Sequence, residues 1–201
     1  MKTNDPFEFV KYFDEINLSD LKTVGGKNSS LGEMYNQLSQ KGIRVPFGFS
    51  TTANAYWAFI YFNELKKEIE ELLLKLDRKT YSNLKEIGEK IRSMIWVAIV
   101  PEEIEREIIS SYKMLCGKYG VDTDVAVRSS ATAEDLPSAS FAGQHESFLN
   151  IRGEEQLIDA IHKCYVSLFT DRAIKYREDK GFNHMNVALS VGVQKMVRSD
   201  L

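Results

Sequence analysis

The chain has 201 residues, enough for one sizeable hydrophobic core or for two small lobes. Its hydrophobic content of 43%, charged content of 27% and formal net charge of −3 are ordinary for a soluble globular protein and give no sign of a nucleic-acid surface. No apolar run approaches the roughly 20 residues of a membrane helix, and the first residues lack the apolar core of a signal peptide. Two isolated thiols, Cys116 and Cys164, stand at apolar helix positions, so we expect buried free cysteines in a reducing cytoplasm.

The first third of the chain predicts a short strand, one helix and an extended connection. Residues 9–16 read as the strand, and a polar turn follows. Gly25-Gly26 interrupts the chain, after which an apolar stripe indicates a helix. Residues 43–49 contain a proline and a glycine, which favours an extended connection, and Thr51 or Thr52 can cap the helix that comes next.

The middle third is predicted to be helical. Apolar residues recur at the spacing of one helix face, and charged residues occupy the opposite face. Pro101 stands where a third helix begins, a position at which its missing N–H costs nothing. Such stripes are far more typical of a packed core than of a recognition surface, so we interpret this region as structural. The three stripes comprise Leu65, Ile69, Leu72 and Leu76; Leu84, Ile87, Ile91 and Ile95; and Ile104, Ile108, Tyr112 and Leu115.

The last third changes its period from that of helices to that of strands. Val125 and Val127 alternate with other residues, which places Arg128 on the face opposite the valines. Two further segments, 145–151 and 187–193, also predict strands, and two amphipathic helices lie between them. The sequence therefore predicts an α+β protein that is rich in helix and has a small mixed or antiparallel sheet.

Residues 127–137 form the most informative segment of the chain. They leave a strand and enter small hydroxylated residues with two carboxylates, and a Phe-Ala-Gly-Gln run follows at 141–144. Polar loops at strand ends often hold ligands. Arg128 can fork onto phosphate oxygens, and hydroxyl and backbone N–H groups supply further donors. The alternative is a solvated turn with a structural arginine, and the spacing alone leaves both interpretations open.

Lys27 is a second candidate for phosphate binding, because it follows Gly25-Gly26 at the start of a helix. The free N–H groups and partial positive charge of a helix start suit phosphate, and Lys27 adds a full charge. The spacing is not that of a Walker loop. A glycine turn followed by a serine cap explains the same residues equally simply.

Three segments in one order carry a resemblance to a known family. They are residues 24–34 (VGGKNSSLGEM), the loop at 127–144, and residues 193–200 (VQKMVRSD). Together they are similar to the N-terminal nucleotide-binding region of phosphoenolpyruvate synthase, within the group of pyruvate phosphate dikinase and rifampicin phosphotransferase. The likeness covers nearly the whole chain and is weakest from Tyr61 to Val121, where only the helical character matches.

The resemblance implies an ATP site and assigns residues to it. Lys27 and Arg128 would contact the phosphates, Gly143 and Ser147 would line the nucleotide pocket, and Gln194 would contact the adenine end. Taken alone, Gln194 is a polar strand residue with small neighbours, which leave room for a flat ring.

Glu134 and Asp135 could be taken as Mg²⁺ ligands, because Mg²⁺ is often held by one or two carboxylates together with substrate phosphates. Adjacent loop residues often point apart, and the resemblance implies metal-linked Glu and Gln residues beyond Leu201. We therefore interpret the pair as loop or domain-contact residues. The histidines show no metal-ligand spacing. His162 lies in an amphipathic helix and is expected to pack there, whereas a contact of His145 with the nucleotide stays open.

The resemblance also implies a larger architecture. Residues 1–201 would be the N-terminal part of the ATP-binding domain, forming the first lobe of an ATP-grasp-like fold. A second lobe, a swivelling phosphohistidine domain and a domain for pyruvate would follow. The implied reaction uses ATP and Mg²⁺ to phosphorylate that histidine, passes the group to pyruvate, and releases AMP and phosphate. No catalytic residue is expected within these residues, and alone they are expected to be inactive.

Alternatives remain open at this point. The same lobe could belong to a rifampicin phosphotransferase or a pyruvate phosphate dikinase, although residues 131–137 and 171–174 look more like the synthase. An alternative of another class is a non-catalytic helical interaction module. The expected partners are ATP, the phosphohistidine domain of the same polypeptide and pyruvate at a distant domain. No nucleic acid or membrane is expected, and the full-length enzyme could be a homodimer.

Overall fold

The computed structural model describes residues 8–132 and 146–197. Five strands form one sheet in the order β1-β2-β5-β3-β4, and every neighbouring pair is antiparallel. The strands are β1 (Val10–Tyr12), β2 (Gly48–Thr51), β3 (Val125–Ala131), β4 (Ser147–Ile151) and β5 (Leu189–Lys195). A small antiparallel sheet in a helix-rich chain confirms the predicted α+β class.

Seven α-helices surround this sheet within the described ranges, and none of them is long and apolar enough to cross a membrane. They are α1 (Leu21–Ser39), α2 (Ala53–Phe62), α3 (Leu65–Leu74), α4 (Leu84–Val97), α5 (Glu102–Tyr119), α6 (Glu154–Ser167) and α7 (Asp171–Asp179). Short 3-10 turns occur at η1 (Phe13–Glu15), η2 (Leu18–Asp20) and η3 (His184–Asn186).

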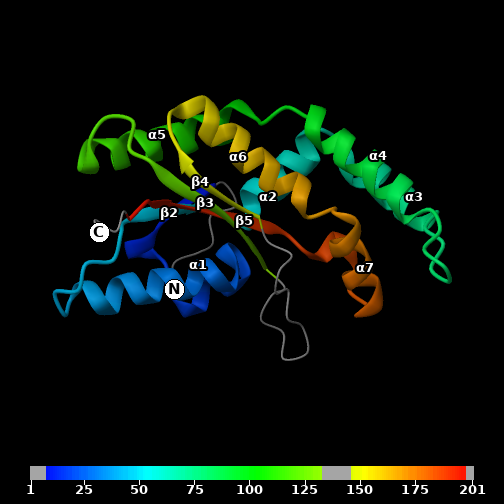
Figure 1. The fold of residues 1–201 in the computed structure, drawn as a ribbon, viewed down its shortest axis with the longest axis horizontal. Helices are drawn as coiled ribbons and strands as arrows, with labels where there is room; N and C mark the ends of the chain where they lie inside the picture. The colour runs from blue at the N-terminus through cyan, green and yellow to red at the C-terminus, as the bar shows by residue number, and fades with distance from the viewer. Residues whose placement is uncertain (1–7, 133–145, 198–201) are drawn as a thin grey trace.

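Different helices pack on the two faces of the sheet. Figure 1 shows α1 on one side, whereas the other helices gather on the opposite side. The alternation in β5 explains this division. Leu189, Val191 and Val193 are buried in the core with the helical layer, whereas Ser190 and Gly192 project toward α1. One face is therefore apolar and closed, and the other is lined by small polar residues.

The helical layer confirms the expectation of a packed core. The predicted stripe residues of α3, α4 and α5 are mostly buried, and Ile69, Ile91 and Ile108 are fully so. The caps also agree with the sequence, since the Thr52 hydroxyl accepts the N–H of Ala55 at the start of α2. Burial of this size is the main source of stability in a domain of this length.

Three local predictions need correction. The opening strand is shorter than 9–16, because the chain turns into η1 directly after Tyr12. Helix α1 starts at Leu21, before the glycines, and is broken by them instead of beginning after them. Cys116 is half-buried, whereas Cys164 is buried as predicted.

Strand β2 lies at the end of the segment that was predicted to be an extended connection. Its four residues are all buried, so they show no alternation of apolar and polar positions. Gly48 is needed because a Cβ there would overlap the backbone oxygen of Val193 in β5. This strand is fixed by pairing with a distant segment, which a local pattern does not reveal.

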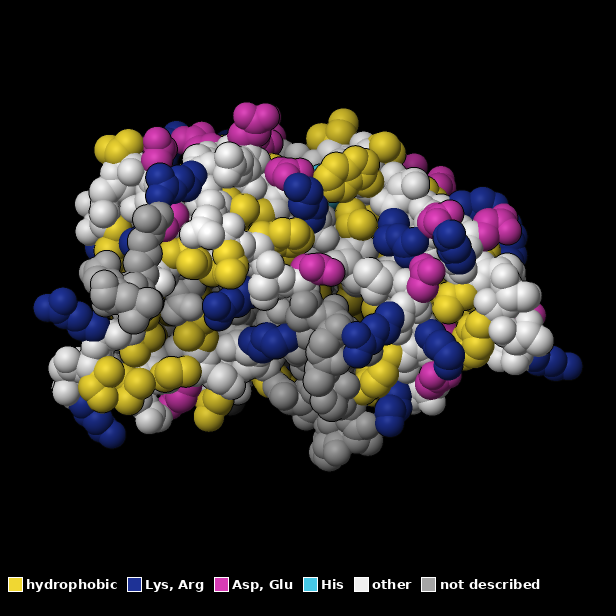
Figure 2. All heavy atoms as spheres, in the orientation of Figure 1, with side chains coloured by type: hydrophobic (Ala, Val, Ile, Leu, Met, Phe, Trp, Pro, Cys, Tyr) yellow, Lys and Arg dark blue, Asp and Glu magenta, His cyan; other side chains and the backbone are white. Residues whose placement is uncertain are grey.

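An apolar patch is exposed on the helical layer. Tyr61, Phe62, Trp96, Val97 and Ile99 are exposed at or just after the ends of α2 and α4, and hydrogen bonds between Asn63 and the Ile99 backbone join these two ends. Figure 2 shows hydrophobic side chains gathered at the top of the view, where α4 ends. The patch lies on the helical side of the sheet and takes no part in the α1 face.

Candidate functional site

The break in α1 positions Lys27. At Gly25 the backbone has φ 72° and ψ 167°, a region open mainly to glycine. A Cβ on Gly25 would lie 2.8 Å from the Ala131 carbonyl oxygen and would overlap the Ser130 hydroxyl. The backbone N–H of Lys27 donates to the same Ser130 hydroxyl over 3.2 Å. The glycine therefore lets the restarted helix approach the end of β3 closely, with Lys27 on the first turn after the break.

Arg128 is an exposed residue in a strand whose other six residues are buried. It pairs with Gly192 of β5 on one side and with Ser147 of β4 on the other. Directly opposite residues of an antiparallel pair project to the same face, so Arg128 and Ser147 share the face on which Gly192 leaves space. Within residues 8–132 and 146–197, the Arg128 guanidinium makes no ion pair or hydrogen bond.

Lys27 and Arg128 belong to the same side of the sheet. Gly192 identifies this side, because a Cβ there would overlap the Asn28 carbonyl oxygen of α1. Ser130, which accepts the N–H of Lys27, stands two residues from Arg128 and projects in the same direction. The two cationic residues thus flank the end of β3 from a helix and a strand, and both are exposed.

The remaining predicted contacts extend along this face. Ser147 is exposed on the edge strand β4, next to Arg128. Gln194 lies on β5 four residues beyond Ser190, roughly 13 Å along the strand. Its side-chain nitrogen donates to the carbonyl of Pro46 over 3.0 Å. The predicted site residues on the α1 face therefore extend from the strand level of Ser190 to that of Gln194.

Four residues considered from the sequence, Glu134, Asp135, Gly143 and His145, lie outside the described residues. Across the residues that the structure does describe, no three His, Cys, Asp or Glu side chains are grouped as metal ligands would be.

His162 packs as predicted. Its Nε2 lies 2.6 Å from the carbonyl oxygen of Ile95, and its ring stacks on Trp96 and meets Phe59 edge-on. All of these partners belong to the helical layer, so His162 is far from the α1 face.

A buried polar network beneath the α1 face was not predicted. Asn28 of α1 donates to the hydroxyls of Ser50 in β2 and Ser190 in β5. The sequence did contain a signal, because Asn28 directly follows Lys27 in a helix turn that packs on the sheet. Its two partners are remote in the chain, and only the sheet order brings them together.

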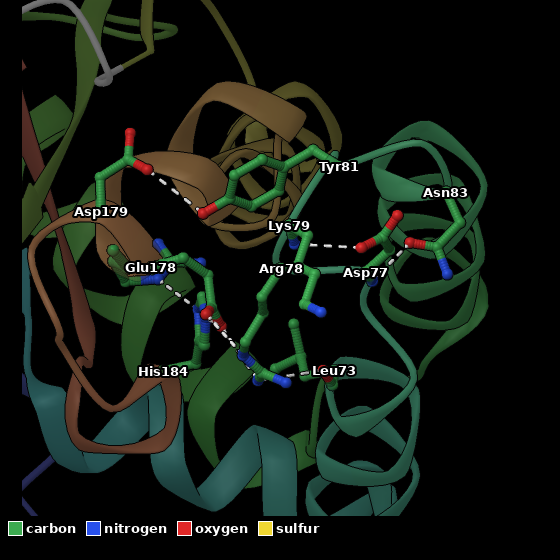
Figure 3. Close-up of polar contacts among 10 residues, drawn as sticks. Leu73, Asp77, Arg78, Lys79, Tyr81, Asn83, Glu178, Asp179 and His184 are labelled. Carbon is green, nitrogen blue, oxygen red and sulfur yellow. Dashed lines mark hydrogen bonds and ion pairs between the residues drawn. The ribbon is translucent and has the colours of Figure 1, made fainter.

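A second polar cluster lies at α7, in the helical layer. Glu178 lies between Arg78 and His184, as Figure 3 shows, with an ion pair of 2.8 Å to Arg78 and a hydrogen bond of 2.9 Å to His184. His184 Nδ1 accepts the Nε–H of buried Arg177 over 2.8 Å. Burial, followed by the nearby Arg177 charge, lowers the pKa of His184 to about 4. This cluster ties α7 to the start of β5 and to the loop after α3.

Comparisons with known proteins show the family to which the chain belongs. Residues 21–201 match the family described as "Pyruvate phosphate dikinase, AMP/ATP-binding domain". Phosphoenolpyruvate synthases from Neisseria meningitidis serogroup B and Synechocystis sp. are 52% identical over 193 residues and 50% identical over 197 residues, in each case over 96% of this chain and 24% of the relative. The Escherichia coli K12 phosphoenolpyruvate synthase is 44% identical over 201 residues, all of this chain and 25% of the relative.

The chain therefore spans about a quarter of the length of these relatives. The match of the family over residues 21–201 includes α1, the whole of β2 to β5 and every predicted site residue. The chain belongs to the pyruvate phosphate dikinase AMP/ATP-binding domain family.

Proposed function

We propose that this chain is the first part of the ATP-binding domain of a phosphoenolpyruvate synthase, a pyruvate, water dikinase. The proposal is supported by membership of an AMP/ATP-binding family and by relatives that carry the name phosphoenolpyruvate synthase at 44–52% identity. In this proposal the chain forms the first lobe of an ATP-grasp-like domain, and ATP lies between it and a second lobe.

The single observation that carries the proposal is the common side of Lys27 and Arg128. Two exposed cations from α1 and β3 flank Ser130 on a sheet face lined by small residues. A polyanion placed there would meet the positive end of the restarted helix, the Lys27 ammonium and the Arg128 guanidinium. Phosphoryl transfer depends mainly on positioning and charge neutralisation, which are the contributions that these residues can make.

The nucleoside end of ATP is proposed to extend toward Gln194. Gln194 is half-buried on the same face, and its side-chain NH₂ group donates one hydrogen to the carbonyl of Pro46. Its second amide hydrogen and its carbonyl oxygen are the groups proposed to meet a ring edge or a sugar hydroxyl. Ser147 would supply a hydroxyl beside Arg128. Gly143, outside the described residues, stays a proposed pocket residue on the basis of the resemblance.

Mg²⁺ is proposed as the partner of the ATP phosphates, although the described residues provide no cluster of carboxylates for it. Cations such as Lys27 and Arg128 repel a metal ion and attract phosphate, so their chemistry fits the anion and not the ion that accompanies it.

The later part of the reaction is proposed to occur outside these residues. The phosphoryl group would pass to a histidine on a mobile domain of the same polypeptide and then to pyruvate, with release of AMP and phosphate. A rifampicin phosphotransferase or a pyruvate phosphate dikinase would use the same ATP lobe with a different acceptor. We prefer the synthase because relatives with that name match over 96–100% of the chain.

The test is a titration of the full-length protein with ATP after single substitutions. Lys27→Ala and Arg128→Ala are expected to weaken ATP binding by about tenfold or more each, because each removes a charge-assisted contact. Lys22→Ala and Arg152→Ala are matched controls that remove one exposed charge from the same helix and from the strand end beside β3. A non-catalytic interaction module predicts no ATP binding and equal indifference to all four substitutions.

A further inference from the structure

Asn28 is a buried polar residue at the point where α1 meets the sheet. Its side chain is 3% exposed, and its nitrogen donates to Ser50 Oγ and Ser190 Oγ, each over 2.9 Å. These hydroxyls belong to β2 and β5, which are neighbours in the sheet. One amide thus bridges two central strands from the helix turn that also carries Lys27.

The orientation of the Asn28 amide follows from the hydrogens of the two serines. Ser190 Oγ donates to the Thr51 carbonyl over 2.6 Å. The Ser50 hydroxyl is satisfied by the same carbonyl at 2.9 Å or by Ser190 Oγ at 2.7 Å. Each hydroxyl has one hydrogen, so both serines have only lone pairs left for Asn28. The amide must therefore turn its NH₂ group to the serines, and its carbonyl oxygen points toward Gly192.

The contact with Gly192 makes this arrangement sterically specific. A Cβ on Gly192 would overlap the Asn28 carbonyl oxygen and would lie 3.2 Å from its Cγ. Gly192 is also the residue of β5 that pairs with Arg128. The Asn28 side chain therefore lies between the Arg128–Gly192 pair of the sheet and the helix turn that contains Lys27.

We propose that Asn28 is a positioning residue for the Lys27 and Arg128 pair, an inference that rests on the ATP site proposed above. Lys27 is held by two neighbouring anchors, its own N–H on Ser130 and the Asn28 amide on the two serines. Without the second anchor, the helix turn can rotate about the first, and the ammonium moves relative to the guanidinium. Displacements of about 1 Å at such a site can reduce rates by about a hundredfold.

Asn36 offers a matched control on the same helix. Its side-chain nitrogen also makes two hydrogen bonds, to the carbonyl oxygens of Phe13 at 3.3 Å and Ile16 at 3.0 Å. These bonds hold the later part of α1 against η1 and the turn that follows it, two helical turns away from Lys27. Asn28→Ala and Asn36→Ala thus remove the same chemical group and the same number of bonds from one helix.

The experiment measures the ATP dissociation constant and the melting temperature of the full-length protein carrying each substitution. We expect Asn28→Ala to weaken ATP binding by about tenfold or more, whereas Asn36→Ala changes it by less than about twofold. Both variants should lower the melting temperature. Ser190→Ala removes little volume and takes away one acceptor of Asn28 together with the bonds of this hydroxyl to Thr51 and Ser50. It should weaken ATP binding by about fivefold, the value of one hydrogen bond, and it serves if Asn28→Ala fails to fold.

A double-mutant comparison separates positioning from a general loss of stability. If Asn28 acts through the serines, Asn28→Ala should weaken ATP binding much less in a protein that already carries Ser50→Ala and Ser190→Ala. Equal effects of Asn28→Ala and Asn36→Ala on ATP binding would overturn the inference. If Lys27→Ala itself leaves ATP binding unchanged, the proposed ATP site fails, and that result is distinct from failure of the positioning role.

Discussion

Gly25→Ala is the substitution that tests the junction of α1 and β3 most directly. The residue has φ 72° and ψ 167°, and it lies against the Ser130 hydroxyl and the backbone carbonyl oxygens of Ser130 and Ala131 at the end of β3. Alanine would introduce one methyl group at this contact. Gly42→Ala is its matched control, because Gly42 has φ 76° and nothing within 4 Å of its Cβ position.

The expected loss of unfolding free energy has two contributions, backbone strain and steric overlap. Gly42→Ala carries only the backbone cost of a left-handed conformation, about 1–2 kcal/mol. Gly25→Ala carries a backbone cost of about 1–3 kcal/mol and also overlaps the Ala131 carbonyl oxygen at 2.8 Å and the Ser130 carbonyl oxygen at 2.9 Å. These backbone atoms belong to residues that pair with Ser190 and Leu189 of β5, so they cannot retreat freely. Overpacking of this kind costs about 1–3 kcal/mol more.

The assay is equilibrium unfolding in urea, followed by tryptophan fluorescence, for the wild-type chain and the two variants. Trp57 and Trp96 lie in the helical layer and report its loss. We expect Gly25→Ala to lose about 2–6 kcal/mol of unfolding free energy and Gly42→Ala about 1–2 kcal/mol. Equal losses would show that the contact with β3 is not tight and that it does not position Lys27.

His184 has a folded-state pKa of about 4, below its ordinary value of 6.5. The free energy of unfolding should therefore be level above pH 6.5 and fall by up to about 3 kcal/mol as the pH drops to 4. His184→Gln should remove this part of the pH dependence in urea titrations. Ile91→Ala, fully buried in α4, should cost about 2–5 kcal/mol, whereas Val97→Ala, 77% exposed at the end of that helix, should change the urea midpoint little. Residues 1–201 alone should bind ATP weakly and release no AMP or phosphate; turnover by the purified chain would contradict the proposal of a second lobe.

Much of the fold could be predicted from the sequence, because its elements have strong periods. The helix stripes around Ile69, Ile91 and Ile108 repeat every three or four residues, and these residues are buried. The alternation in β3 placed Arg128 on the face opposite Val125 and Val127, and this prediction is confirmed by its exposure in a buried strand. In each case, the signal lies within one element.

The sequence could not reveal features that depend on two distant segments. Strand β2 has four buried residues and takes its conformation from β1 and β5, so no alternation marks it. The Asn28 bridge depends on which strands are neighbours, and the order of the sheet differs from the order of the chain. Lys27 was identified as a candidate, but the direction in which α1 presents it depends on the break at Gly25 and on Ser130.

The two faces of the sheet separate the apolar core from the proposed ATP site. The face with Leu189, Val191 and Val193 is closed by the helical layer, and substitutions there should act through the unfolding free energy. On the other face, Lys27 and Arg128 are exposed, so their replacement should cost little stability. A loss of ATP binding in those two variants can then be attributed to the lost charge. Substitutions at the junction beneath them, between α1 and the strand ends, should instead change the unfolding free energy and the ATP affinity together. The same contacts hold the helix on the sheet and position Lys27.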